Sequence, residues 1–153
     1  MRRIYLLWLL GIIILMPISL TSCSDDNIGS SNDLIGTWES VSLSGWYKEN
    51  KEIVEQWEDE PDDDFKIVFN EDGTFESYER YYGQWHGGLE GTWTYKGGKI
   101  YMRDYEYDEE EVVTVKKLTS SQLVTEYHHK HMDTEEGIVY EEYQSTVYRK
   151  ISD

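Results

Sequence analysis

Three histidines near the C-terminal end of the chain offer the clearest opportunity for metal chemistry. They are His128, His129 and His131, and we expect residues 122–132 to form a β-strand. Because side chains alternate along a strand, His129 and His131 would share one face and His128 would lie on the other. Two imidazoles at this spacing can bind one Zn²⁺, with a carboxylate or His86 completing the site. The alternative is an exposed strand whose histidines pair with neighbouring carboxylates.

Two acidic segments, residues 58–64 and 108–111, could supply the oxygen ligands that Ca²⁺ prefers. Residues 58–64 lack the glycine and the distal glutamate of an EF-hand loop. We therefore expect both segments to be solvated loops in which like charges repel one another.

The sequence contains no recognisable catalytic motif. It has no G-x-S-x-G nucleophile elbow, no phosphate-binding loop and no dinucleotide-binding fingerprint. Its carboxylates are too numerous to single out a glycosidase-like acid–base pair. We therefore predict a protein that is not an enzyme and that uses no cofactor.

Aromatic side chains in predicted connections are the candidates for ligand binding. They are Trp46, Tyr47, Trp57 and Trp85. The first three fall in the long connection 45–64, in which residues 51–57 would form a short helix or an irregular loop, and Trp85 falls in the Gly-rich segment 83–91. Rings beside carboxylates could form a platform for a glycan, because rings stack on sugar faces and acids bind hydroxyls. The alternative is a cluster that only caps one end of the fold.

The composition excludes several classes of partner. The 153 residues include 14 Lys and Arg against 31 Asp and Glu, which gives a formal net charge of −17. Such a chain lacks the basic surface that nucleic-acid binding requires. Its length suits one domain, and its hydrophobic fraction of 39% is too high for disorder throughout. The absence of alanine and the 13 tyrosines disfavour a helical protein.

Residues 1–22 have the organisation of a secretory signal peptide. Arg2 and Arg3 precede an almost wholly apolar stretch, residues 4–20, which is short for a membrane-spanning helix of ~20 residues. Small residues follow this stretch, as they do at a cleavage site. The alternative is a permanent N-terminal anchor helix.

Leu20, Thr21, Ser22 and Cys23 at the end of this segment resemble the bacterial lipobox. The resemblance implies that Cys23 is acylated and becomes the first residue of a lipoprotein anchored in the outer membrane. Cys23 is the only cysteine of the chain, so it cannot form an intramolecular disulfide. Residues 24–26, Ser-Asp-Asp, resemble a signal for export to the cell surface and otherwise begin an acidic linker. Residues 23–33 would form a tether.

From residue 34 onward the chain alternates between short strands and turns, and we predict an all-β domain over residues 34–151. The strands are expected at residues 34–43, 65–69, 74–82, 92–95, 99–107, 111–118, 122–132 and 138–150. Gly73, Gly97 and Gly98 mark turns that call for positive φ. Short connections join antiparallel neighbours. The simplest arrangement is therefore an eight-stranded antiparallel up-and-down meander closed into a β-barrel, since closure removes exposed edges.

Gly36, Thr37 and Trp38 at the head of this meander match the G-x-W hallmark of lipocalins, and residues 69–75 and 91–95 resemble bacterial lipocalin-like lipoprotein domains. The resemblance covers residues 34–151 and implies an up-and-down barrel with an apolar interior. It implies that Trp38 packs across the barrel floor beside a late-strand arginine, for which Arg149 is the candidate. It also implies that residues 45–64 arch over the open mouth.

These observations predict a lipid-anchored envelope lipoprotein whose lipocalin-like barrel binds a small apolar molecule. We expect a neutral or cationic ligand, because the acidic residues 58–64 would repel anions. The alternative is a non-catalytic structural or interaction module whose loops contact a glycan or a protein partner. The size of the interior side chains separates these two hypotheses, because a barrel filled by large residues has no cavity.

Overall fold

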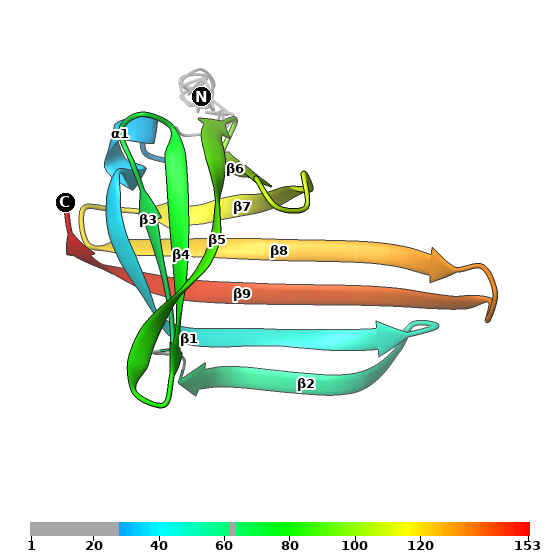
Figure 1. Ribbon diagram of the computed structural model, residues 1–153. Coiled ribbons are helices and arrows are strands. Elements are labelled where there is room, and N and C mark those ends of the chain that lie inside the picture. Colours follow the sequence, from blue (N-terminus) through cyan, green and yellow to red (C-terminus); the bar gives the residue numbers. More distant parts are fainter. Residues whose placement is uncertain (1–27, 62–63) are drawn as a thin grey trace, which may run out of the picture.

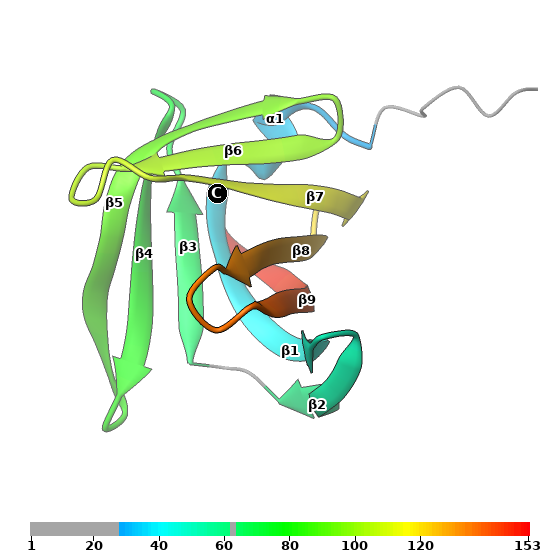
Figure 2. The same cartoon turned by 90° about the vertical axis from the view of Figure 1, so that its right-hand side faces the viewer.

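The computed structural model describes residues 28–61 and 64–153 and shows one antiparallel sheet that closes on itself. Strands β3 to β9 follow one another in the sheet, and β1 completes the ring by pairing with both β3 and β9 (Figure 2). The predicted closed barrel of eight antiparallel strands is therefore confirmed. The elements are α1 (Ser31–Leu34), β1 (Gly36–Glu49), β2 (Glu52–Pro61), β3 (Phe65–Phe69), β4 (Thr74–Tyr81), β5 (Gln84–Lys96), β6 (Lys99–Asp104), β7 (Glu110–Leu118), β8 (Gln122–Asp133) and β9 (Ile138–Ser152).

Strand β2 is additional to the barrel and replaces the irregular connection predicted for residues 45–64. It forms a hairpin with the second half of β1, from Ser42 to Glu49. The helix or irregular loop considered for residues 51–57 is wrong. Strand β9 explains this difference, because it pairs with β1 along nearly its whole length and holds that chain extended.

The tip of the β1–β2 hairpin is fixed by an asparagine. Asn50 and Lys51 have φ angles of 49° and 75°, the left-handed conformation that asparagine tolerates better than most residues. The Asn50 backbone N–H donates to the carbonyl of Val139, at 2.8 Å. The Val139 N–H in turn donates to the Asn50 side-chain oxygen, at 3.0 Å. The tip is thereby tied to β9.

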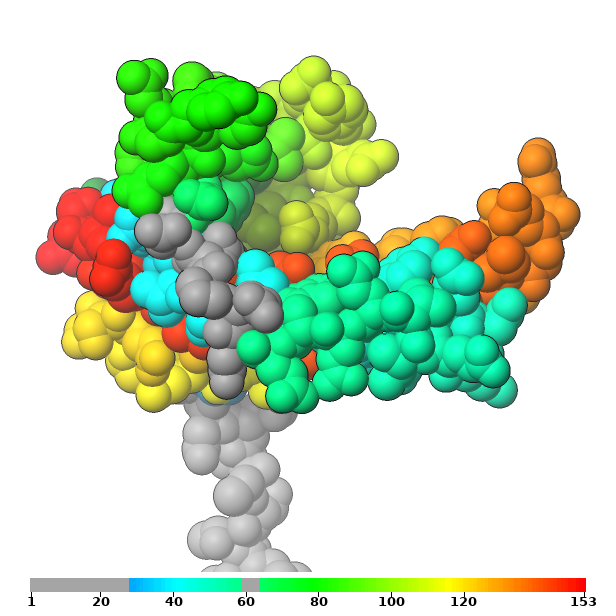
Figure 3. All heavy atoms as spheres, turned by 90° about the horizontal axis from the view of Figure 1, so that it is seen from below, coloured from blue at the N-terminus to red at the C-terminus, as the bar shows by residue number. Residues whose placement is uncertain are grey.

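Strands β1, β8 and β9 continue beyond the barrel and form with β2 a sheet that we call the arm, comprising residues 42–49, 52–61, 126–133 and 138–145. The β8–β9 pairing runs without a register shift from Gln122 in the barrel to Asp133 at the end of the arm. Figures 1 and 3 show the arm projecting away from the barrel. Because side chains alternate without interruption along β8, the inner wall of the barrel continues as one face of the arm.

Within the Gly-rich segment 83–91, predicted as a loop, residues 84–91 instead form the first half of β5. Gly91 shows why a glycine is placed within this strand. A Cβ atom at this position would lie 2.0 Å from the Arg103 carbonyl oxygen and 2.7 Å from the ring of Phe75. The glycine therefore allows the neighbouring strand and the core to approach closely. The predicted glycine turns are confirmed, since Gly73, Gly97 and Gly98 have φ angles of 83°, 60° and 72°.

The closed end of the barrel is filled by a compact apolar core. Trp38 is fully buried, and its indole N–H donates to the carbonyl of Leu34 in α1, at 2.7 Å. The ring of Phe69 meets the ring of Trp93 edge to face, with centroids 5.1 Å apart. The buried apolar residues are Leu34, Trp38, Ile67, Phe69, Phe75, Trp93, Ile100, Val113, Val115 and Leu123. The short helix α1 thus plugs the floor that Trp38 covers.

The cation over Trp38 is Lys150, and not the expected Arg149. The Lys150 ammonium lies 5.5 Å from the centroid of the Trp38 ring. Arg149 points to the other side of β9, where its guanidinium donates to one carboxylate oxygen of Glu39 at 2.7 and 3.1 Å. The alternation of side chains along β9 accounts for the difference, because only one of two consecutive residues can face the core.

Candidate functional site

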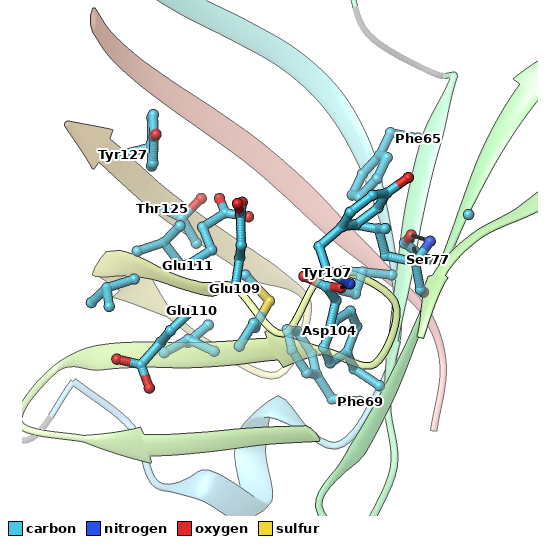
Figure 4. A pocket seen from close by; sticks show the side chains of 18 of the residues that line it. Phe65, Phe69, Ser77, Asp104, Tyr107, Glu109, Glu110, Glu111, Thr125 and Tyr127 are labelled. Atoms are coloured by element: carbon cyan, nitrogen blue, oxygen red, sulfur yellow. Dashed lines mark hydrogen bonds between the residues drawn. The ribbon is translucent and has the colours of Figure 1, made fainter. Parts of the chain in front are cut away.

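The barrel encloses a cavity of about 1030 Å³ that is open at the end opposite α1. Its floor and walls are largely apolar, and Figure 4 shows several of the side chains that surround it. The apolar and aromatic residues that line it are Phe65, Ile67, Phe69, Phe75, Leu89, Ile100, Met102, Tyr107, Val112, Val113, Leu123, Tyr127 and Tyr148. The interior is therefore not packed solid, and a small molecule fits within its volume.

Carboxylates replace apolar side chains toward the mouth of the cavity. Strand β4 contributes Glu79 after the buried Phe75, strand β6 contributes Asp104 after Ile100, and strand β7 contributes Glu111 after Val113. We call Glu79, Asp104 and Glu111 the mouth carboxylates. No lysine or arginine among the described residues lines this cavity. The site is therefore apolar at its base and negative at its opening.

The β6–β7 loop adds further acidic residues to the rim. The Tyr107 N–H donates to a carboxylate oxygen of Asp104 at 2.5 Å, which fixes the loop against the end of β6. Figure 4 shows Glu109 and Glu111 on one side of the chain and Glu110 directed away from them. Arg103 lies on the outer side with Glu110, and its guanidinium pairs with Asp108 at 2.9 Å. Arg103 is thus paired outside the cavity, whereas His129 lines it.

The environment of the mouth shifts the pKa of two lining groups. Desolvation raises the pKa of Glu111 above its ordinary value, although its side chain is still reached by solvent. Desolvation also raises the pKa of Tyr127, with further contributions from the charges of Glu111 and Glu142. Both shifts are in the direction that disfavours the negatively charged form of the group.

The histidines of β8 lie on two different faces of the sheet. His129 lies between Tyr127, on which it stacks with a centroid distance of 6.2 Å, and His131, whose tilted ring is 5.4 Å away. His131 also stacks on Tyr140 of β9, at 5.0 Å. His128 lies on the outer face, where its Nε2 is 2.9 Å from a carboxylate oxygen of Glu141. These contacts build an aromatic row that leads from the cavity onto the arm.

Metal binding by His129 and His131 stays a prediction. Within residues 28–61 and 64–153, no three His, Cys, Asp or Glu side chains are grouped closely enough to hold a metal ion. The two rings instead stack with tyrosines, which gives each imidazole a partner other than a metal. Of the proposed Ca²⁺ ligands of residues 108–111, Glu109, Glu110 and Glu111 line the cavity and Asp108 does not. Residues 62 and 63 of the other acidic segment lie outside the described residues.

The aromatic residues predicted to bind a ligand do not line the cavity. Trp46 lies on the outer face of the arm, stacked on Tyr143 at 5.7 Å with the Lys48 ammonium 3.6 Å from the centroid of its ring. Tyr47 lies on the opposite face, stacked on Tyr140 at 6.0 Å. The expectation that residues 45–64 arch over the mouth is therefore wrong, because this segment forms the β1–β2 hairpin of the arm.

Trp57 and Trp85 occupy two further places. Trp57 of β2 lies against Gly45 of β1, where an added Cβ atom would be only 2.6 Å from its ring. Trp85 of β5 lies outside the barrel wall, with the Lys66 ammonium and the Arg80 guanidinium 4.5 and 4.9 Å from the ring centroid. The four predicted aromatics are thus dispersed and do not form one binding platform.

Sequence reasoning missed the mouth carboxylates, although a signal for them exists. Along each of β4, β6 and β7 the inward-facing positions lead from a buried apolar residue near the floor to a carboxylate near the mouth. On β7, read from the floor to the mouth, this series is Val115, Val113 and Glu111. Carboxylates at the mouth end of the inward series of several strands are the pattern that marks the mouth.

The predicted signal peptide, residues 1–22, the lipid attachment residue Cys23 and residues 24–26 all lie outside the described residues. Among the residues that are described, no helix has the length and apolar character to cross a membrane. The described chain begins at Ile28, which packs against the core and whose carbonyl accepts a hydrogen bond from the Tyr95 hydroxyl.

A closed antiparallel barrel of eight strands with an open, apolar-walled cavity is the architecture of the lipocalin-like class. The chain belongs to the lipocalin-like domain family, whose sequence model matches residues 34–125. A lipocalin-like protein from Bacteroides uniformis has a similar fold, with a TM-score of 0.52, 19% sequence identity, and 78% of this chain and 99% of that chain covered. A protein from Bacteroides eggerthii described as uncharacterized gives a TM-score of 0.48 at 16% identity, over 77% of this chain and 99% of that chain. No curated protein matches the sequence.

Proposed function

We propose that this protein is a lipid-anchored envelope lipoprotein that binds a small, largely apolar molecule in its barrel. The observation that carries the proposal is the open cavity of about 1030 Å³ with its apolar floor. Burial of apolar ligand surface there would contribute about 25 cal/mol per Å². Trp38, Leu34 and the rest of the core fill the opposite end, so the cavity is a blind pocket and not a channel.

Native mass spectrometry of the protein purified from its own host tests this function. We expect a retained small molecule, released on denaturation, in the wild-type protein. Thr125→Trp places a large ring in the cavity, because Thr125 lines it and is 6% exposed. Val124→Trp is the matched control, since the neighbouring side chain points to the other face of β8. Retention by wild type and Val124→Trp but not by Thr125→Trp is the expected result, and equal retention by all three would contradict the cavity as the site.

The proposed anchor is tested separately from the cavity. Cys23 closes the lipobox and is the only thiol, so Cys23→Ser should yield a protein without acyl mass that is released from the membrane. Replacing Asp25 and Asp26 by Ala should leave the acylation intact and reduce labelling at the cell surface. An acylated Cys23→Ser protein would overturn the anchor, and unchanged surface labelling of the double variant would reduce residues 24–26 to a linker.

The arm supports a second candidate function, an interaction module that contacts a protein or glycan partner. Its surface exposes the apolar side chains of Ile53, Val54 and Met132, which are 54%, 54% and 61% exposed. Exposed apolar surface does not stabilise a monomer and is typical of interaction sites. Ile53→Lys with Met132→Lys tests this candidate, and it should abolish partner capture while leaving cavity binding unchanged.

A further inference from the structure

We infer that the cavity selects organic cations, which place an apolar body on the barrel floor and an amine or quaternary ammonium group among the mouth carboxylates. The inference rests on the proposed binding function, and it names the class of ligand that the same cavity takes. Its basis is the arrangement of charge along the cavity wall, together with the aromatic rings that share the mouth.

The first observation is that the mouth carboxylates lack counter-ions from the protein. Among the described residues, neither Glu79 nor Glu111 takes part in an ion pair, and Asp104 accepts only the backbone N–H of Tyr107. Three basic side chains of the surrounding strands are engaged elsewhere, and His129, which lines the cavity, stacks on Tyr127. Lys66 and Arg80 lie over Trp85 on the outer wall, and Lys116 pairs with Glu126 at 3.4 Å. A ligand cation would supply the charge that the protein leaves out.

The second observation is the aromatic character of the mouth. Tyr107 and Tyr127 line the cavity beside the carboxylates, and Phe65 is paired in register with Glu79 across β3 and β4. The faces of such rings attract ammonium groups within about 6 Å of their centroids. Tyr127 stays neutral at physiological pH, because its raised pKa opposes formation of a further anion. Rings and carboxylates together suit a bulky ammonium better than a bare metal ion.

The third observation is the separation of the apolar and charged parts. The floor consists of Phe69, Phe75, Ile100 and Leu123, which offer no charged or hydrogen-bonding side chain. An anionic amphiphile would have to place its head beside the carboxylates if its apolar tail occupied this floor, and like charges repel there. A neutral amphiphile would make favourable apolar contacts with the floor but no favourable electrostatic interaction with the mouth carboxylates. The geometry therefore ranks cationic above neutral above anionic ligands.

Isothermal titration calorimetry with three probes of equal chain length tests this ranking on the full purified protein. The probes are n-octyltrimethylammonium, n-octanol and n-octyl sulfate, all used below micelle-forming concentrations. We expect the ammonium to bind about tenfold or more tightly than the alcohol, because of its contacts with carboxylates and rings. The sulfate should bind most weakly, and added salt should reduce the difference between the probes.

Two variants of equal net charge separate the site from the general acidity of the chain. Glu79→Gln, Asp104→Asn and Glu111→Gln together should remove the preference for the ammonium and leave octanol binding unchanged. The control combines Glu71→Gln, Glu90→Gln and Glu135→Gln, three exposed positions that do not line the cavity. It should keep the preference of the wild-type protein. Circular dichroism of both variants checks that the barrel has formed.

The outcomes distinguish this inference from the function on which it rests. Equal binding of the ammonium and the alcohol to the wild-type protein overturns cation selection and leaves the apolar cavity in place. An equal loss of preference in both triple variants also overturns it, because net charge alone would then explain the selectivity. Failure of all three probes to bind overturns the proposed binding function together with the inference.

Discussion

Strand β1 carries two tryptophans, one in the buried core of the barrel and one on an open face of the arm. Trp38 is fully buried at the barrel floor, where it meets α1 and the core. Trp46, eight positions later on the same strand, lies on an open face of the arm against Tyr143 and Lys48. The backbone ladder to β9 continues through both places. The difference shows that one strand can be stabilised in two ways. Burial of side chains stabilises the half of β1 in the barrel, and contacts with side chains of neighbouring strands stabilise the half in the arm.

This contrast also separates the regions by what they can do. Closure around a buried floor lets the barrel keep an open cavity without collapsing, because the strands above the floor are already held in a ring. The arm has no second sheet over either face in Figure 1, so it offers surfaces and not an interior. Under the proposed function, ligand binding would therefore belong to the barrel, and contact with a larger partner would belong to the arm.

Trp38→Ala should give the largest effect. Emptying a buried tryptophan site costs about 3–5 kcal/mol of unfolding free energy, and here the indole hydrogen bond to Leu34 is lost as well. Urea denaturation monitored by circular dichroism measures the change. A loss below ~1 kcal/mol would show that Trp38 contributes no more than a surface residue.

Gly91→Ala should destabilise the barrel by about 1–3 kcal/mol, the usual cost of overpacking. The added methyl group would meet the Arg103 carbonyl oxygen at 2.0 Å, and a backbone atom of a paired strand cannot move aside easily. Gly87→Ala is the matched control on β5, because its Cβ would meet nothing within 4 Å. Equal stability of the two variants would mean that β5 and β6 are farther apart than the structure indicates.

Trp46→Ala should cost only about 1–2 kcal/mol, since it removes one stacked ring and one cation–π contact from an open face. Hydrogen exchange should then show faster opening of the arm amides, such as those of residues 140–143, without a change in β4 to β7. Global acceleration of exchange would show instead that arm and barrel unfold as one unit.

The sequence was sufficient for the barrel because its strands carry local signals. Phe65, Ile67 and Phe69 alternate on one face, and glycines mark the hairpin turns, so β3 and its neighbours could be assigned from period and turn chemistry alone. The arm could not be assigned in this way. Residues 45–64 are acidic and irregular in pattern, and they become strands because β9 is long enough to pair with them. Such non-local pairing leaves no local signature.

The same distinction explains what was missed at the site. The sequence favours ligand binding for Trp46 and Trp57, because both fall in a predicted loop. In the structure Trp46 lies on a strand paired with β9, and Trp57 lies against Gly45. The residues next to the two tryptophans in the sequence do not indicate these contacts. The lining of the cavity depends on which inward-facing residues lie opposite one another across the barrel. Their positions are set only when the sheet closes into a barrel. Glu111 illustrates this dependence, since its neighbour in sequence, Glu110, lies on the outer side with Arg103.

Glu111→Gln should give the smallest effect, and one of opposite sign. Desolvation raises the pKa of Glu111 in the folded protein above the ordinary value of 4.5, so the folded state holds this proton more tightly than the unfolded state. Stability therefore falls as pH rises from this ordinary value through the raised pKa. Removing the charge should make Glu111→Gln slightly more stable than the wild type at neutral pH.

The pH dependence of this difference is the decisive measurement. Below the ordinary pKa of 4.5 the carboxyl is protonated in both states, so the two proteins should become equally stable as the pH is lowered toward 4. Thermal denaturation from pH 4 to 8 follows the change, with Glu90→Gln as the control at an exposed position that does not line the cavity. A Glu111→Gln protein that is less stable than the wild type at pH 7 would mean that Glu111 has a stabilising partner. A more stable variant that also loses its preference for the ammonium probe would show that this carboxylate is kept for binding, at the expense of the stability of the barrel.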